Sequence, residues 1–125
     1  MRKLALVVAM VVMAIPFFAG VALAADQIIQ CKSVPCYGSG GNDKIYERKG
    51  NGVDDRIVMR GGSDLVLANG YGNDTDIVKG GRGYDKINVA DGDKYDKASG
   101  GFGGDWCIVD AKKEAFMGCS RVTVR

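Results

Sequence analysis

Aspartates recur through this chain at a regular spacing, and each is followed two residues later by an apolar or small residue. Successive Asp-to-Asp steps alternate between 11 or 12 residues and 9 residues, so the double step is 20 or 21 residues. A repeat of this kind indicates a coil in which each lap adds one structural unit. The seven aspartates of the repeat are Asp43, Asp55, Asp64, Asp76, Asp85, Asp96 and Asp105.

Glycine divides these aspartates into two series. In the first series (Asp43, Asp64, Asp85 and Asp105) a glycine lies two residues before every Asp. In the second series (Asp55, Asp76 and Asp96) that position holds Val53, Asp74 and Lys94. Glycine is needed where the backbone takes a positive φ or passes close to another group. We call the turns of the two series the first edge and the second edge. The first-edge glycines are Gly38, Gly41, Gly62, Gly80, Gly81, Gly83, Gly100, Gly101 and Gly103.

Two short strands and two turns per lap account for both series. Side chains alternate between the two faces of a strand, so the apolar residue after each Asp points into the coil and its neighbours point outward. Seven strands make about three and a half laps. We therefore predict an all-β fold, a parallel β-roll or β-solenoid over residues 38–109. Residues 25–37 and 110–125 are expected to cover its open ends as terminal caps.

The first 24 residues have the pattern of a secretory signal peptide. Arg2 and Lys3 precede a long apolar run, and Ala22-Leu23-Ala24 provides the small residues of a cleavage site. We predict cleavage after Ala24, a secreted mature chain, and no membrane association after cleavage. An uncleaved membrane anchor is the alternative, because the apolar run is just long enough to span a bilayer.

Composition excludes several classes of function. The chain has no histidine, so it has neither a Ser–His–Asp triad nor a His-ligated zinc site. Arg2 and Lys3 account for the whole excess of basic residues, which leaves 15 basic and 15 acidic side chains in residues 25–125. This balance predicts no nucleic-acid binding. No constellation of residues marks a catalytic site, so we expect no enzymatic activity, and the sequence indicates no protein partner.

Four cysteines in an exported domain are expected to form two disulfides, for which three pairings exist. The ends of a coil of three and a half laps lie roughly 15 Å apart, whereas a disulfide requires Cα atoms within about 7 Å. We therefore predict the local pairs Cys31–Cys36 and Cys107–Cys119, each pinning one terminal cap. Free thiols are the alternative.

Two stretches of the chain match a known nonapeptide pattern. Residues 80–88 fit G-G-x-G-x-D-x-U-x throughout, and residues 100–108 fit it with Cys107 as the apolar member. These repeats resemble the RTX, or hemolysin-type, calcium-binding family, whose nonapeptides build a parallel β-roll. Residues 38–43 and 59–64 look like partial copies.

The resemblance implies a function. In that family, turns stacked one lap apart hold Ca²⁺ between them through Asp carboxylates and backbone carbonyls, the oxygen ligands that calcium prefers. Carried over, this assigns Ca²⁺ to Asp43, Asp64, Asp85 and Asp105 at the first edge. A weaker assignment covers Asp55, Asp76 and Asp96 at the second edge, where the turns are longer and lack the glycine. Asp54, Asp74 and Asp93 are further candidate ligands there. The implied function is a secreted protein whose fold Ca²⁺ stabilises. The alternative is a calcium-independent solenoid that serves as an interaction module, its aspartates merely closing turns.

Overall fold

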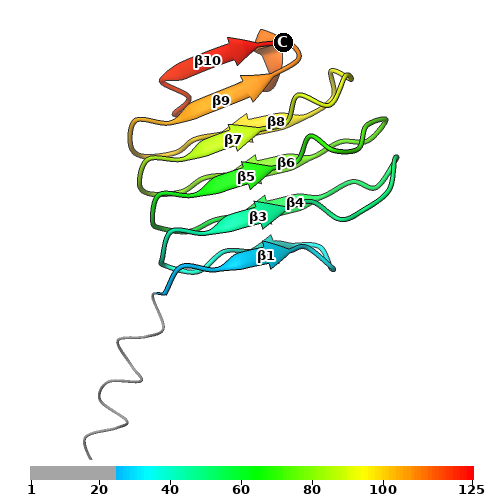
Figure 1. Cartoon of the computed structure of the whole chain (residues 1–125). Helices are drawn as coiled ribbons and strands as arrows, with labels where there is room; N and C mark the ends of the chain where they lie inside the picture. Colours follow the sequence, from blue (N-terminus) through cyan, green and yellow to red (C-terminus); the bar gives the residue numbers. More distant parts are fainter. Residues whose placement is uncertain (1–24) are drawn as a thin grey trace, which may run out of the picture.

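The computed structural model describes residues 25–125, and the predicted signal peptide lies outside these residues. The described chain is a parallel β-solenoid, as predicted, with strands stacked lap upon lap in two sheets (Figure 1). It has about four turns, compared with the three and a half predicted, because the terminal segments add strands to the stack. The strands are β1 (Ile28–Gln30), β2 (Cys36–Tyr37), β3 (Lys44–Tyr46), β4 (Arg56–Val58), β5 (Leu65–Leu67), β6 (Ile77–Lys79), β7 (Lys86–Asn88), β8 (Lys97–Ser99), β9 (Trp106–Val109) and β10 (Arg121–Val124).

The two sheets follow the two series of the repeat. One sheet has the order β1-β3-β5-β7-β9-β10 and the other β2-β4-β6-β8, and all neighbouring strands are parallel. Each predicted inward residue lies next to its counterpart one lap away, as Val66 does to Ile87. These side chains are fully buried and form the centre of the narrow core: Ile45, Ile57, Val66, Val78, Ile87, Ala98 and Cys107.

The coil continues into both segments that were expected to act as caps. In residues 25–37, β1 pairs with β3 and β2 pairs with β4; near the C-terminus, β10 pairs with β9. The predicted disulfides are confirmed: Cys31 bonds to Cys36 and Cys107 to Cys119, with Cα–Cα distances of 5.7 and 5.6 Å. Each bond lies inside one of these terminal laps. No helix in residues 25–125 has the length and apolar composition that crossing a bilayer requires.

Stacked turns at the first edge explain the phase of the glycines. Gly81 has a φ of +88°, and a Cβ placed on it would lie 2.1 Å from the carbonyl oxygen of Arg60, one lap earlier. Arg60 itself has a φ of +77°, a conformation that costs a non-glycine residue about 1–2 kcal/mol. The carbonyl of one lap therefore occupies the space that a side chain would need in the next.

This stacking predicts the effect of adding one methyl group. Gly81→Ala is expected to lower the free energy of unfolding by at least about 2 kcal/mol, because it adds both backbone strain and a clash with a backbone atom. Gly61→Ala is the matched control, since nothing lies within 4 Å of its added Cβ. Urea unfolding of both variants measures the difference. Equal midpoints for the two variants would contradict the stacked-turn geometry.

Candidate metal site at the second edge

Each repeat aspartate is buried at the start of a strand, where it ties two laps together. The backbone amide of Asp64 donates to Oδ1 of Asp85 at 2.9 Å, and the amide of Asp85 donates to Oδ1 of Asp105 at 2.8 Å. At the second edge, the amides of Asp55 and Asp76 donate to Oδ1 of the next Asp at 2.8 Å. Hydrogen bonds to a carboxylate are stronger than neutral ones, so these two ladders fix the register of the laps.

The ladders use only one oxygen of most of these carboxylates. The second oxygen, Oδ2, is buried and has no hydrogen-bond partner in five repeat aspartates: Asp64, Asp76, Asp85, Asp96 and Asp105. Asp43 differs, because Ser39 replaces a glycine of the pattern and donates to its Oδ2 from both N and Oγ. A buried carboxylate oxygen without a donor is costly unless a proton or a cation accompanies it.

Groups of acidic side chains form at the second edge, whose longer turns extend to one side of the stack in Figure 1. Within each group, one carboxylate oxygen per residue lies within 4.8 Å of the others. The largest group is Asp74, Asp76, Asp91 and Asp96; the two smaller groups are Glu47–Asp55–Asp76 and Asp93–Asp96–Glu114. The sequence favoured the first edge for metal. In the described residues, however, no first-edge aspartate belongs to such a group.

Asp74 contributes the most unpartnered oxygens to the largest group. Both of its carboxylate oxygens are buried without a partner, and Asp76, Asp91 and Asp96 each add one further unpartnered oxygen. Carboxylate oxygens are the ligands of hard divalent cations such as Ca²⁺. These four residues could therefore hold a metal ion.

Glu47 is a site residue that the repeat did not reveal. It lies one position beyond β3, its amide donates to the carbonyl of Leu67 at 3.2 Å, and its side chain is 4 % exposed. Ala68 and Val89 occupy the corresponding inward position after β5 and β7. Glu47 Oε1 accepts hydrogen bonds from two amides of the next lap, and Oε2 has no partner. The sequence signal that could have identified Glu47 is a carboxylate at a position where later laps carry a buried apolar residue.

Asp91 and Glu114 are the other residues that the repeat missed. Asp91 belongs to the polar second-edge turn that precedes Asp96. Glu114 lies in the 3₁₀ turn Lys112–Glu114, and its Oε1 accepts the amide of Asp96 at 3.3 Å. Glu114 thus takes the place of a further repeat aspartate at the end of the second-edge ladder. The Asp-x-apolar pattern could not identify it, because Glu114 is a longer acid outside the regular spacing.

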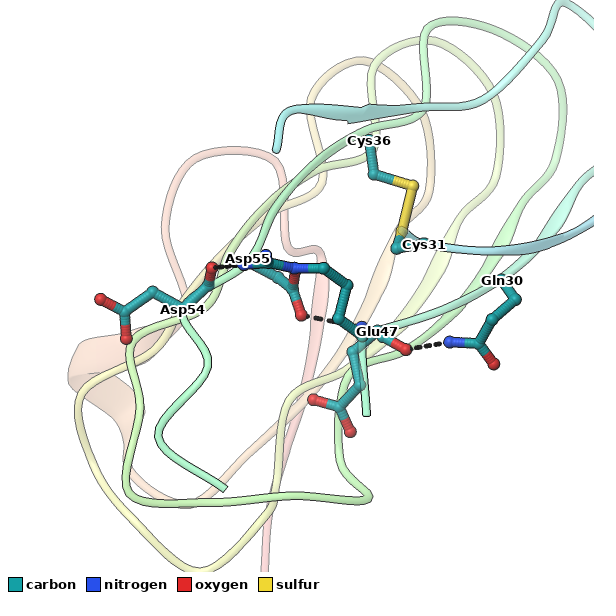
Figure 2. Close-up of a disulfide and its surroundings, with 7 residues drawn as sticks. Gln30, Cys31, Cys36, Glu47, Asp54 and Asp55 are labelled. Atoms are coloured by element: carbon teal, nitrogen blue, oxygen red, sulfur yellow. Dashed lines mark hydrogen bonds and ion pairs between the residues drawn. A yellow bond between two sulfur atoms is a disulfide. The ribbon is translucent and has the colours of Figure 1, made fainter. Parts of the chain in front are cut away.

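An arginine already supplies a positive charge in the first lap of the second edge. Figure 2 shows this region beside the Cys31–Cys36 disulfide. Arg48 Nε donates to Oδ1 of Asp55 at 2.7 Å, and the Arg48 amide donates to Oδ2 of the same side chain at 2.9 Å. Arg48 Nη2 also donates to the carbonyl of Asp54. Asp55 is therefore satisfied without metal, whereas Asp74 and Asp76 one lap later have no comparable cation.

Burial raises the pKa of aspartates at both edges above their ordinary value of 3.8. The pKa of Asp96 rises to about 8 and that of Asp85 to about 7. The pKa of Asp74 rises to about 6, with the charge of Asp91 as the next contribution after burial. Burial likewise raises the pKa of Asp76 and of Glu47. The ionised metal-free edge is thus electrostatically unfavourable, and either protons or cations relieve it.

These raised values predict the pH dependence of stability without divalent cations. A carboxyl with a higher pKa in the folded than in the unfolded state binds more protons when folded. In EGTA the free energy of unfolding should therefore fall as pH rises from about 4 toward about 8. Excess Ca²⁺ should flatten or reverse this slope, because the cation replaces the protons. Urea unfolding across this pH range measures both slopes, and greater stability at the alkaline end in EGTA would contradict the assignment.

Arg48 provides a second test. In EGTA, Arg48→Gln is expected to lower the free energy of unfolding by about 1–3 kcal/mol, less than for a fully buried pair because the arginine side chain is 29 % exposed. Added Ca²⁺ should recover much of the loss, since it can replace the charge of Arg48 beside Asp55 in the group Glu47–Asp55–Asp76. Lys49→Gln is the neighbouring control. If the two variants lose equal stability, Arg48 does not compensate the buried charge.

Comparison with protein-family models, curated proteins and solved structures finds no match to this chain.

Proposed function

We propose that this chain is a secreted calcium-binding β-solenoid of the RTX type, in which Ca²⁺ held among the turns stabilises the fold. The observation that carries the proposal is the group Asp74–Asp76–Asp91–Asp96, which brings unpartnered, mostly buried carboxylate oxygens together. Calcium suits this group better than a softer metal because all the side-chain ligands are oxygens. Secretion is supported by the N-terminal signal pattern and by the two disulfides, which persist in oxidising compartments.

Calcium binding would be coupled to folding in this domain. The carboxylates of the group come from different laps, so the group forms only when the laps are stacked. A ligand that binds only the folded state stabilises it in proportion to the logarithm of its concentration above Kd. The narrow core makes such a contribution valuable, since each lap buries few apolar side chains.

The first edge supports a second group of calcium sites in this proposal. Oδ2 of Asp85 and the carbonyl oxygen of Gly100 both lie close to the α-carbon of Gly80, at 2.4 and 2.6 Å from a Cβ placed there. Oδ2 of Asp105 and the carbonyl oxygen of Gly118 lie similarly around Gly100. A carboxylate and a carbonyl of adjacent laps therefore approach each other, as calcium coordination between stacked turns requires.

A calcium-independent interaction module is the second candidate. It is favoured by the Asp ladders, which join the laps through backbone amides without any metal. The two candidates differ in what the remaining Oδ2 atoms do. In the module they stay protonated, whereas in the calcium protein they are ligands.

Calorimetric titration with Ca²⁺ separates the two candidates when paired with matched variants. Asp74→Asn should weaken binding at one site at least about tenfold, because it removes a charged ligand from the largest group. The same change should leave the EGTA form equally stable or more stable, since it also removes a buried charge. Asp54→Asn is the control, because Asp54 is exposed and belongs to none of the groups.

The titration also has a result that contradicts calcium binding. If about 10 mM Ca²⁺ releases no heat and shifts neither the melting temperature nor the circular dichroism spectrum, the calcium-independent module is the correct reading. Indistinguishable titrations for Asp74→Asn and Asp54→Asn would show that calcium binds elsewhere.

A further inference from the structure

The charges of this domain are separated by depth. Residues 25–125 carry equal numbers of basic and acidic side chains, yet no lysine or arginine among them is buried. Most of the acids are buried: Asp43, Glu47, Asp55, Asp64, Asp74, Asp76, Asp85, Asp96, Asp105 and Glu114. The Arg48–Asp55 pair is the only ion pair within residues 25–125. A net charge near zero therefore conceals a basic exterior around an acidic interior.

The basic side chains reach both flat faces of the solenoid. None of the strands carries an acidic residue. Lys44, Lys86 and Arg121 flank the inward residues of the six-stranded sheet and point outward. Arg56, Lys79 and Lys97 do the same on the four-stranded sheet. Each face thus presents three cations and no strand carboxylate to neutralise them.

Aromatic rings hold several of these cations in place. Lys86 Nζ and Arg121 Cζ each lie 4.2 Å from the centre of the Trp106 ring, to which neighbouring strands bring them. The indole Nε1 donates to Thr123 Oγ1 at 2.9 Å, which fixes the ring. Lys97 similarly lies 5.8 Å from the ring centre of Phe116. Cation–π contacts of this kind reduce the side-chain freedom that would be lost on binding a ligand.

We propose that the two sheet faces bind an acidic polysaccharide when the buried carboxylates hold their cations. The inference rests on the proposed function in one respect: each bound Ca²⁺ adds two positive charges to a domain whose formal net charge is zero. With Ca²⁺ bound, the negative charge of the buried carboxylates no longer offsets the positive charge of the exposed lysines and arginines. Complementary charge of this kind supplies both affinity and a fast encounter.

A polysaccharide fits these surfaces better than other polyanions. A bilayer is planar and would engage one face, whereas cations lie on both faces of the solenoid. Single-stranded nucleic acid is held by bases stacked on free aromatic rings. On and beside the sheet faces, cations already lie over the rings of Trp106, Tyr46 and Phe116. The exposed rings of Tyr84 and Phe102 lie in the first-edge turns, outside the strands. A flexible chain that carries carboxylate or sulfate groups needs only the spaced cations.

Fluorescence anisotropy with labelled dextran sulfate and uncharged dextran tests the proposal on the purified chain. With Ca²⁺ present, dextran sulfate should bind and dextran should not. Binding should weaken about 10- to 50-fold between about 50 and about 200 mM NaCl, as three or four charge contacts imply. Replacing Ca²⁺ by EGTA should weaken it at least about tenfold. Lys86→Gln combined with Arg121→Gln should cost about tenfold.

Two cations outside the strands provide the control for the sheet faces. Lys32→Gln combined with Lys112→Gln removes two exposed cations that lie outside the strands, and should change binding less than about twofold. An equal loss in both double variants would overturn the sheet faces as the site. Equal binding in Ca²⁺ and EGTA would overturn the link to calcium. Tighter binding to a DNA oligonucleotide, or to phosphatidylserine vesicles, than to dextran sulfate would overturn the polysaccharide assignment.

A failure of calcium binding can be distinguished from a failure of polysaccharide binding. Calorimetric titration of the same samples with Ca²⁺ reports the proposed function alone, without any polymer. Calcium binding without dextran sulfate binding overturns only the further inference. If calcium does not bind, the proposed function fails whether or not the polymer binds.

Discussion

The burial of one carboxylate per turn is the constraint on which the rest of this structure depends. One oxygen of every repeat aspartate except Asp55 accepts an amide of the preceding lap, as Asp85 does from Asp64. This bond sets the register that stacks the apolar residues into a core. The other oxygen is left buried without a donor in most laps. A fold with so narrow a core cannot absorb many such charges, so it requires cations or protons at its edges.

The fold was predictable because one short rule governs most laps. Asp at the start of a strand and an apolar residue two positions later fix the strand, its inward side chain and its partner, and the structure confirms all seven inward residues. Local disulfides followed from the separation of the coil's ends. The terminal laps escaped prediction because β2 and β10 follow no Asp-x-apolar pair. The Asp26–Ile28 pair before β1 is one residue out of register, since Ile29 is the residue that pairs with the inward Ile45.

The candidate site was less predictable, since it depends on turns that differ between laps. Asp76 and Asp96 were identified by spacing, but Glu47 and Glu114 reach the second edge from a core position and a 3₁₀ turn. The regular first edge looked stronger in sequence because glycines mark it. The irregular second edge gathers more carboxylates because its longer turns have room for them. The net charge did not predict the basic exterior, because it counts buried and exposed side chains alike.

A crystal structure of the chain grown with Ca²⁺ would show whether the second-edge carboxylates bind the ion. We expect an ion among Asp74, Asp76, Asp91 and Asp96, with oxygen ligands at about 2.3–2.6 Å and an anomalous signal appropriate to calcium. The Oδ1 ladder between laps should persist, because that oxygen already accepts a backbone amide. Well-ordered carboxylates in this group with no ion between them, at saturating Ca²⁺, would contradict calcium binding at the second edge.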